Sequence, residues 1–158
     1  MTASLPLWPF AILATLVVLG WRQSRDRVVQ PATLARLALA MLGLSLYGVT
    51  AAFGAQATPV FAWALGFVAA VLVGGPVFAP RGLAKEGRAV RVPGSWQPMG
   101  LMVGIFVAKF ALGFAAGTGA HVVHETWFIA AMSATFGLLS GAFAARAMAV
   151  HRFVRAAA

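Results

Sequence analysis

A single lysine in the middle of a long apolar run is the residue of this sequence best placed for chemistry. Lys109 stands about eleven residues into the run from Pro98 to Ala120. If that run is a helix that crosses a membrane, a rise of about 1.5 Å per residue puts the ammonium group roughly 16 Å deep, near the midplane. A charge at that depth costs about 2.5–3.5 kcal/mol on insertion scales, so we expect another group to compensate for it.

The sequence offers Lys109 polar neighbours but no carboxylate at its depth. The three acidic residues fall at helix ends or in connections: Asp26, Glu86 and Glu125. We therefore predict a ligand-binding site that combines Lys109 with Tyr47 and Ser133, whose hydroxyl groups can share its hydrogen bonds, and with Gly113 on the same helix face. Further hydroxyl candidates are Thr15, Ser45 and Thr135. The sequence leaves four states of Lys109 open. In the first two, the side chain is a neutral amine hydrogen-bonded inside the bundle or a charged group in a water-filled cavity. In the other two, it snorkels to the interface or binds an acidic or carbonyl-bearing ligand.

One short stretch, His121-Val-Val-His124-Glu125, gathers residue types that bind metals. Histidines three residues apart can share one helix face, and the glutamate could join them. The order differs from H-E-x-x-H, so the chemistry of that motif does not transfer. We favour a solvated polar loop, and we predict no metal, no cofactor and no enzymatic activity.

Composition identifies the solvent that surrounds most of the chain. Of the 158 residues, 61% are hydrophobic and 9% are charged, whereas soluble domains carry about 25% charged residues. A soluble core of this size could not bury so much apolar surface, which points to lipid. The chain has no cysteine, and this excludes disulfides and thiol chemistry. The net charge of +9 comes from basic residues between apolar runs, so we predict contact with anionic headgroups and no nucleic-acid partner.

Apolar runs of about 20 residues are long enough to cross the hydrocarbon core of a bilayer as helices. We predict one transmembrane domain over residues 1–158, an all-α bundle with five spans at 5–21, 34–53, 59–79, 98–120 and 126–150. Between the third and fourth spans, alternating Val90, Arg91 and Val92 predict a short cytoplasmic hairpin that turns at Glu86-Gly87.

Basic residues occur in alternate connections, which predicts the orientation. The first connection, the third connection and the C-terminal tail carry Lys and Arg, whereas the other connections and the N-terminus carry none. By the positive-inside rule, the N-terminus lies outside and the C-terminus in the cytoplasm, and we expect a bacterial inner-membrane protein. The tryptophans are predicted to anchor both interfaces: Trp8, Trp21, Trp63, Trp96 and Trp127.

Small residues at helical spacing predict close helix packing. The fourth and fifth spans each hold a G-x-x-x-G motif: Gly100/Gly104 and Gly137/Gly141. Such motifs let two backbones approach in lipid. Packing within the chain and packing against a second copy, as a homodimer, both fit the motifs.

The segment from Val92 to Pro98, V-P-G-S-W-Q-P, followed by a helix with a central lysine, resembles a family of small proteobacterial inner-membrane proteins known as a domain of unknown function. The arrangement of helices and charged loops is also similar to that of CcdC-like membrane proteins associated with cytochrome c biogenesis. The first resemblance implies the same topology but no activity. From the residues we expect a transporter, channel or ligand-binding protein, or else a non-catalytic accessory subunit of a membrane complex.

Overall fold

The computed structural model describes residues 8–156 of the chain. Five α-helices and a 3-10 helix account for most of them, and three short strands account for part of the rest. The helices are α1 (Trp8–Gln23), α2 (Pro31–Phe53), α3 (Ala57–Phe78), α4 (Gln97–Gly117) and α5 (Thr126–Ala156), with the 3-10 helix η1 (His121–His124) before α5. Helices α2 to α5 agree with the predicted spans to within a few residues at each start, and α5 continues past residue 150. Each of these four is long and apolar enough to cross a membrane.

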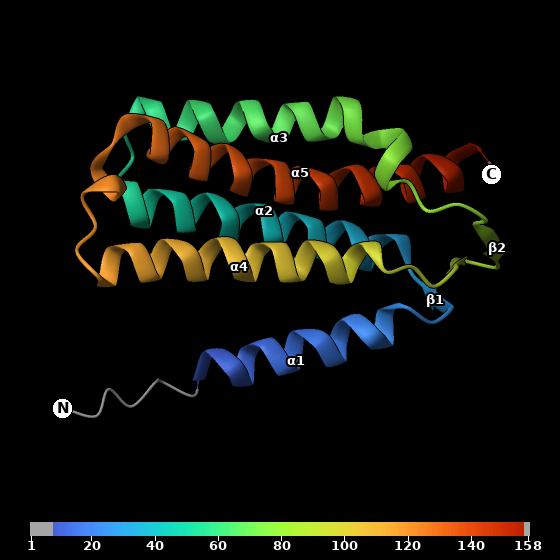
Figure 1. The fold of residues 1–158 in the computed structure, drawn as a ribbon. Coiled ribbons are helices and arrows are strands. Elements are labelled where there is room, and N and C mark those ends of the chain that lie inside the picture. The colour runs from blue at the N-terminus through green and yellow to red at the C-terminus, as the bar shows by residue number, and fades with distance from the viewer. Residues whose placement is uncertain (1–7, 157–158) are drawn as a thin grey trace.

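Helix α5 is the centre of the bundle. It contacts α2, α3 and α4, and Figure 1 shows it running alongside α3 over most of its length. Its 31 residues extend for about 46 Å, which exceeds the roughly 30 Å of bilayer hydrocarbon. The C-terminal part of α5 therefore reaches beyond the other helices, to the end of the molecule that holds the strands.

Glycines allow α3 and α5 to pack with their backbones in direct contact. Gly137 and Gly141 are buried, and a Cβ atom at either position would collide with the backbone of α3 at Trp63 or Phe67. From the other side, a Cβ atom at Gly66 would collide with the carbonyl group of Ala134. The predicted motif of the fifth span therefore packs within the chain, as expected where small residues replace the hydrophobic effect in lipid.

The motif of the fourth span behaves differently. Gly104 faces Leu139 of α5, whose Cδ2 would lie 3.3 Å from an added Cβ atom. Gly100 is exposed and has no neighbouring atom within 4 Å of that position. Gly100 therefore takes no part in packing within the described chain, because α4 meets α5 more loosely than α3 does, and its packing against a second copy stays a prediction.

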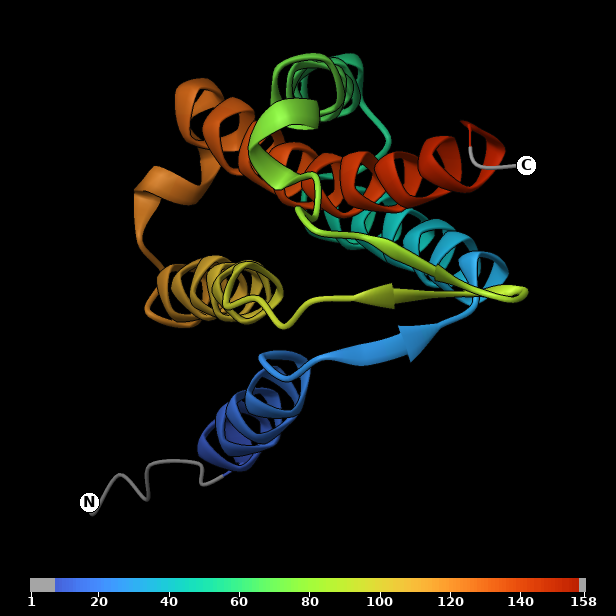
Figure 2. The same ribbon diagram turned by 90° about the vertical axis from the view of Figure 1, so that its right-hand side faces the viewer.

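Helix α1 lies beside α4, on the side away from α3 (Figures 1 and 2). Its contact is close at Gly20, where an added Cβ atom would lie 2.5 Å from Cγ of Met99. The 16 residues of α1 extend for about 24 Å, less than the length of the other four helices. The start of the predicted first span, residues 5–7, lies outside the described residues.

A three-stranded antiparallel sheet closes one end of the bundle. Strands β2 (Ala84–Glu86) and β3 (Ala89–Val92) form the predicted hairpin, and its turn is Gly87-Arg88, one residue later than expected. Gly87 has φ +61°, which suits the first turn position of a type II′ hairpin. Strand β1 (Arg27–Val29), which was not predicted, pairs with β3 and joins the first connection to the third.

The sheet is held to α5 by a small apolar core of its own. Val90 and Val92 of β3 pack against Val150, together with Val29 of β1 and Phe153 of α5. Val90, Val92 and Val150 are almost fully buried. This second core explains why α5 continues beyond the expected span and why the two basic connections are held at the same end.

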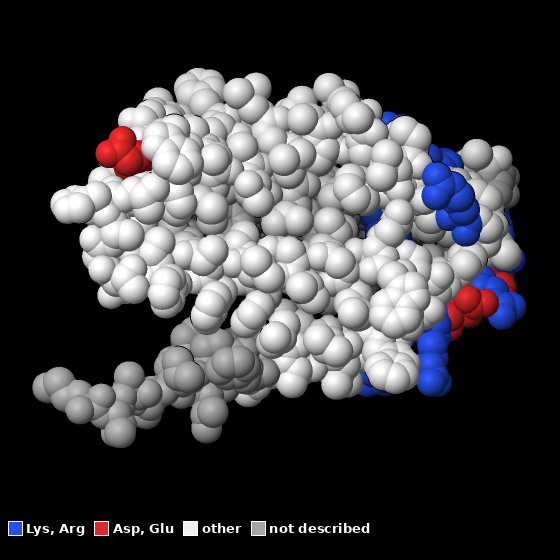
Figure 3. Space-filling view, in the orientation of Figure 1, with Lys and Arg blue, Asp and Glu red and all other residues white. Residues whose placement is uncertain are grey.

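Basic side chains gather at this end of the molecule, as Figure 3 shows. The first connection, the hairpin and the end of α5 meet here, whereas the α2–α3 connection and η1 lie at the opposite end (Figure 1). The segments that the sequence predicted to share one side of a membrane therefore do share one end of the fold.

Three of the tryptophans predicted at membrane interfaces lie exposed near helix ends. Trp21, Trp96 and Trp127 are 60–64% exposed near helix ends. Trp63 contradicts the prediction because it is buried, donates its indole N–H to Ser45 Oγ at 3.1 Å, and stacks on Phe67. It lies on the face of α3 that packs against α5, so it belongs to the core. The side chain of Trp8 lies outside the described part of the structure.

Candidate functional site

Lys109 lies in the middle of α4 and reaches across to α2 and α5. Its ammonium Nζ sits 5.1 Å from the ring centroid of Phe136, within the range of a cation–π interaction. A Cβ atom added at Gly48 of α2 would lie 2.7 Å from Nζ. Gly48 therefore leaves the space that the ammonium group occupies, and no larger residue fits there without displacing it.

A small cavity adjoins this ammonium group. It has a volume of about 30 Å³ and is lined by residues of three helices: Met41, Leu44, Ser45, Ile105, Lys109, Phe136 and Ser140. A cavity of that size holds one or two waters, since each water needs roughly 10–15 Å³ by this measure. Drug-sized ligands occupy pockets of about 300–1,000 Å³. The site therefore accommodates one small polar group beside the lysine.

Two serines supply the polar lining, and one of them connects three helices. Ser45 Oγ donates to the carbonyl of Phe136 at 3.1 Å while accepting from Trp63, so it joins α2, α3 and α5. Ser140 Oγ donates to the same carbonyl at 2.9 Å. Both hydroxyl groups are thus engaged with the protein backbone, which leaves the ammonium of Lys109 as the group in the cavity with donors to spare.

Of the predicted companions of Lys109, Ser45 lines its cavity, whereas Tyr47, Gly113 and Ser133 do not. Tyr47 is 70% exposed and Gly113 is open to its surroundings, so neither lines the cavity. Ser133 is completely buried, and its Oγ has no hydrogen-bond partner among the described residues. Ser140, which was not predicted, also lines the cavity. Its position two turns after Ser133, on the same face of α5, is the sequence signal that could have identified it. Tyr47 does not reach the cavity because it is two residues from Ser45 and therefore lies on the opposite face of α2.

No described carboxylate approaches Lys109. Asp26 and Glu86 lie in the sheet region, where both face Arg91, and Glu125 follows η1 at the other end of the bundle. These are the three acidic residues of the chain. Among residues 8–156, which include every acidic side chain of the chain, Lys109 therefore has no ion-pair partner.

The histidine cluster lies at the same end as Glu125. His121 and His124 begin and end η1, and both are exposed. Within residues 8–156, no group of three or more His, Asp or Glu side chains is placed to hold a metal ion. The structure thus does not gather His121, His124 and Glu125 into a metal site.

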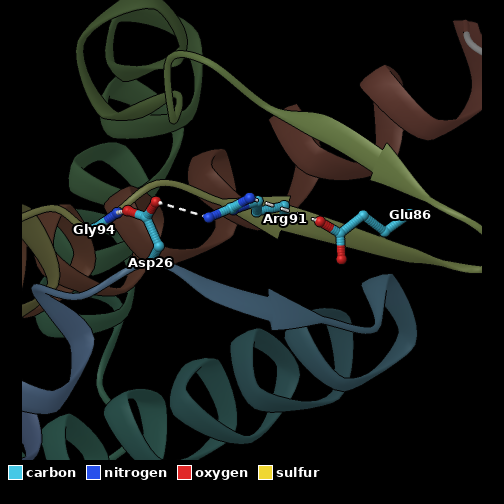
Figure 4. A network of polar contacts seen from close by, with 4 residues as sticks. All are labelled: Asp26, Glu86, Arg91 and Gly94. Atoms are coloured by element: carbon cyan, nitrogen blue, oxygen red, sulfur yellow. Dashed lines mark hydrogen bonds and ion pairs between the residues drawn. The ribbon is translucent and has the colours of Figure 1, made fainter.

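The segment Val92 to Pro98 is anchored to the first connection. Gly94 donates its backbone N–H to Asp26 Oδ1 at 2.8 Å, and Arg91 approaches Asp26 Oδ2 at 3.5 Å and Glu86 Oε1 at 4.0 Å (Figure 4). A Cβ atom at Gly94 would collide with the carbonyl group of Ser24. Glycine is therefore required where the two connections cross.

The comparisons with known proteins give a family but no activity. No curated protein and no solved structure matches the chain. A family model described as a family of unknown function (DUF6622) matches residues 1–158. That match agrees with the resemblance to a domain of unknown function, and it covers the whole chain. The chain therefore belongs to the DUF6622 family of unknown function.

Proposed function

We propose that this chain is a non-catalytic subunit of a bacterial inner-membrane complex, in which Lys109 pairs with a carboxylate of another membrane protein. The observation that carries the proposal is a lysine in the middle of the apolar helix α4 with no carboxylate partner among the described residues. A charge at this depth is retained against a cost of about 2.5–3.5 kcal/mol, and such residues commonly pair with one another.

The proposal includes five membrane-spanning helices with the N-terminus outside. Helices α2 to α5 have the length and hydropathy of spans. Helix α1 is shorter, but it lies alongside α4 and connects to the sheet at the basic end. With all five helices across the bilayer, the sheet and the end of α5 face the cytoplasm, in agreement with the positive-inside rule.

The size of the Lys109 cavity favours a partner helix over a transported solute. About 30 Å³ suits a carboxylate that enters from the side, whereas a solute needs several times that volume. Lys109 itself belongs to the exposed residues of α4, so a neighbouring helix can reach it from the lipid. The corresponding interface on α4 includes Phe110 and Phe114, which are 51% and 65% exposed.

A second copy of this chain does not supply the missing carboxylate. Its Asp26, Glu86 and Glu125 lie near the ends of its own bundle, far from the level of Lys109 along the helices. The partner is therefore a different protein with an Asp or Glu inside a transmembrane helix.

Photo-crosslinking in native membranes tests this pairing. A crosslinking amino acid at Gly113, one turn from Lys109 on exposed α4, is expected to capture one heterologous membrane protein. Lys109→Met should reduce that product at least about tenfold, because a hydrogen bond to a charged group contributes about 1.5–3 kcal/mol. Lys109→Arg keeps the charge and should retain the product.

A crosslinker at Leu72, which is 74% exposed on α3, serves as the control and should not give this product. The captured protein must carry a membrane-embedded carboxylate whose removal has the same effect as Lys109→Met. A product that is equally abundant with and without Lys109 contradicts the proposal. Lys109→Met should leave the bundle folded, since it removes a costly charge and keeps a side chain of similar length between Gly48 and Phe136.

A further inference from the structure

A second cavity, at the basic end of the bundle, has two arginines in its lining. It has a volume of about 30 Å³ and lies between β1, α2, α4 and α5. Arg27 and Arg146 contribute its charged groups, and Leu34, Pro98 and Phe143 contribute much of its apolar wall. The two guanidinium groups come from segments 119 positions apart in the chain, so the tertiary fold alone brings them together.

Arg146 is held in place at this cavity by a chain of hydrogen bonds. It is only 7% exposed, and its Nη1 donates to Gln97 Oε1 at 3.1 Å. Gln97 in turn donates from Nε2 to the carbonyl of Val77 at 2.9 Å, which ties α3, α4 and α5 together. A guanidinium group has five N–H donors, so the bond to Gln97 leaves most of them available to an anion in the cavity.

The electrostatic setting of the cavity is positive from several directions. Arg27 and Arg146 repel each other, and burial lowers the pKa of Arg27. Pro98, in the first turn of α4, lines the same cavity, so the positive end of this helix dipole lies next to it. Like charges held together in a partly buried site favour an anion that binds both.

We propose that this cavity binds the phosphate of a phosphate ester, with Arg27 and Arg146 as its two cationic ligands. Guanidinium groups bind phosphate with paired, charge-assisted hydrogen bonds. The volume suits about two water-sized groups, which matches the two non-bridging oxygens of a phosphodiester. With the basic end in the cytoplasm, the cavity lies at headgroup level, where anionic lipids carry such a group beside acyl chains that suit its apolar wall.

The inference is independent of the role of Lys109, because the two sites share no lining residue. Only the lipid as its source depends on the membrane orientation proposed above. Free phosphate carries the same chemistry, and the experiment must separate the two sources.

The test measures binding to the detergent-purified full chain at constant ionic strength. Phosphatidylglycerol, phosphatidylcholine and inorganic phosphate are titrated separately, with thermal unfolding as the readout. We expect phosphatidylglycerol to raise the melting temperature of the wild type, and Arg27→Gln and Arg146→Gln each to weaken binding at least about tenfold. Arg155→Gln removes the same charge from an exposed position on α5 and should keep the wild-type affinity.

Each outcome decides the question. The expected pattern with phosphatidylglycerol supports a lipid ligand, and the same pattern with inorganic phosphate alone supports a free phosphate ligand. If Arg155→Gln weakens binding as much as Arg27→Gln, the attraction is diffuse and the site is refuted. The same holds if neither anion stabilises the wild type. Should Arg146→Gln fail to fold, the half-buried Arg27 still allows a decision through Arg27→Gln.

Discussion

Replacing Gly137 with leucine is expected to prevent α3 and α5 from packing and to destabilise the fold by more than about 3 kcal/mol. Inserting even single methylenes into a tight interface costs about 1–3 kcal/mol. Here the obstacle is the backbone of α3 at Trp63 and Phe67, which cannot move aside as a side chain can. Because α5 also packs against α2, α4 and the sheet, its displacement should affect the whole bundle.

The measurement is the fraction of protein recovered monodisperse in mild detergent, followed by denaturation in SDS. Gly100→Leu is the matched control, since it adds the same side chain to a membrane helix where no atom lies within 4 Å of the added Cβ. Equal recovery of the two variants would show that α3 and α5 do not pack as described.

Gly94→Val is expected to separate the first and third connections and to destabilise the sheet end by about 1–3 kcal/mol. A Cβ atom at this position would run into the carbonyl group of Ser24. The crossing would open, and the bond from Gly94 N–H to Asp26 would be lost with it. β1 should then detach from β3, because Asp26 directly precedes that strand.

Limited trypsin digestion of the detergent-purified protein measures this opening. The connection between α1 and α2 contains Arg25 and Arg27, so detachment of β1 should accelerate cleavage there several-fold. Gly100→Val, six residues further along, should be cleaved at the wild-type rate. Unchanged cleavage of Gly94→Val would mean that the crossing tolerates a side chain.

Hydrophobic patterning identified the helices because lipid requires long apolar runs, whatever the tertiary contacts. Helices α2 to α5 follow the runs, and alternating Val90, Arg91 and Val92 with Gly87 nearby specify a hairpin through local turn chemistry. Strand β1 escaped prediction because three residues carry no periodic signal. Its existence depends on pairing Arg27 with Val92, across more than sixty residues of chain.

The candidate site was predicted less completely than the helices. Lys109 was evident because an ionisable residue inside a membrane-spanning run is costly and rare. Its neighbours were predicted only in part, with Ser45 among several candidates, because the faces of a membrane helix are all apolar and hydrophobicity does not tell which face meets another helix. Tyr47 was therefore expected inward although it points outward, and Trp63 was expected at the interface although it packs beside Ser45.

The arginine cavity also lay beyond sequence reasoning. In the sequence, Arg27 and Arg146 each belong to a basic segment that the positive-inside rule already explains. Only the sheet, which folds the first connection back over the end of the bundle, places Arg27 beside α5. A basic residue that becomes buried in this way leaves no local signal in the sequence.

Cysteine labelling of intact cells tests the membrane arrangement, on which the pairing of Lys109 and the lipid source of the phosphate depend. The chain has no native cysteine, so Thr2→Cys, Gln56→Cys and Lys85→Cys each introduce a single thiol. Five spans with an external N-terminus predict that a membrane-impermeant maleimide labels positions 2 and 56 from outside, and labels position 85 only after permeabilisation. Labelling of position 85 in intact cells, or of position 56 without position 2, would contradict the five-span arrangement.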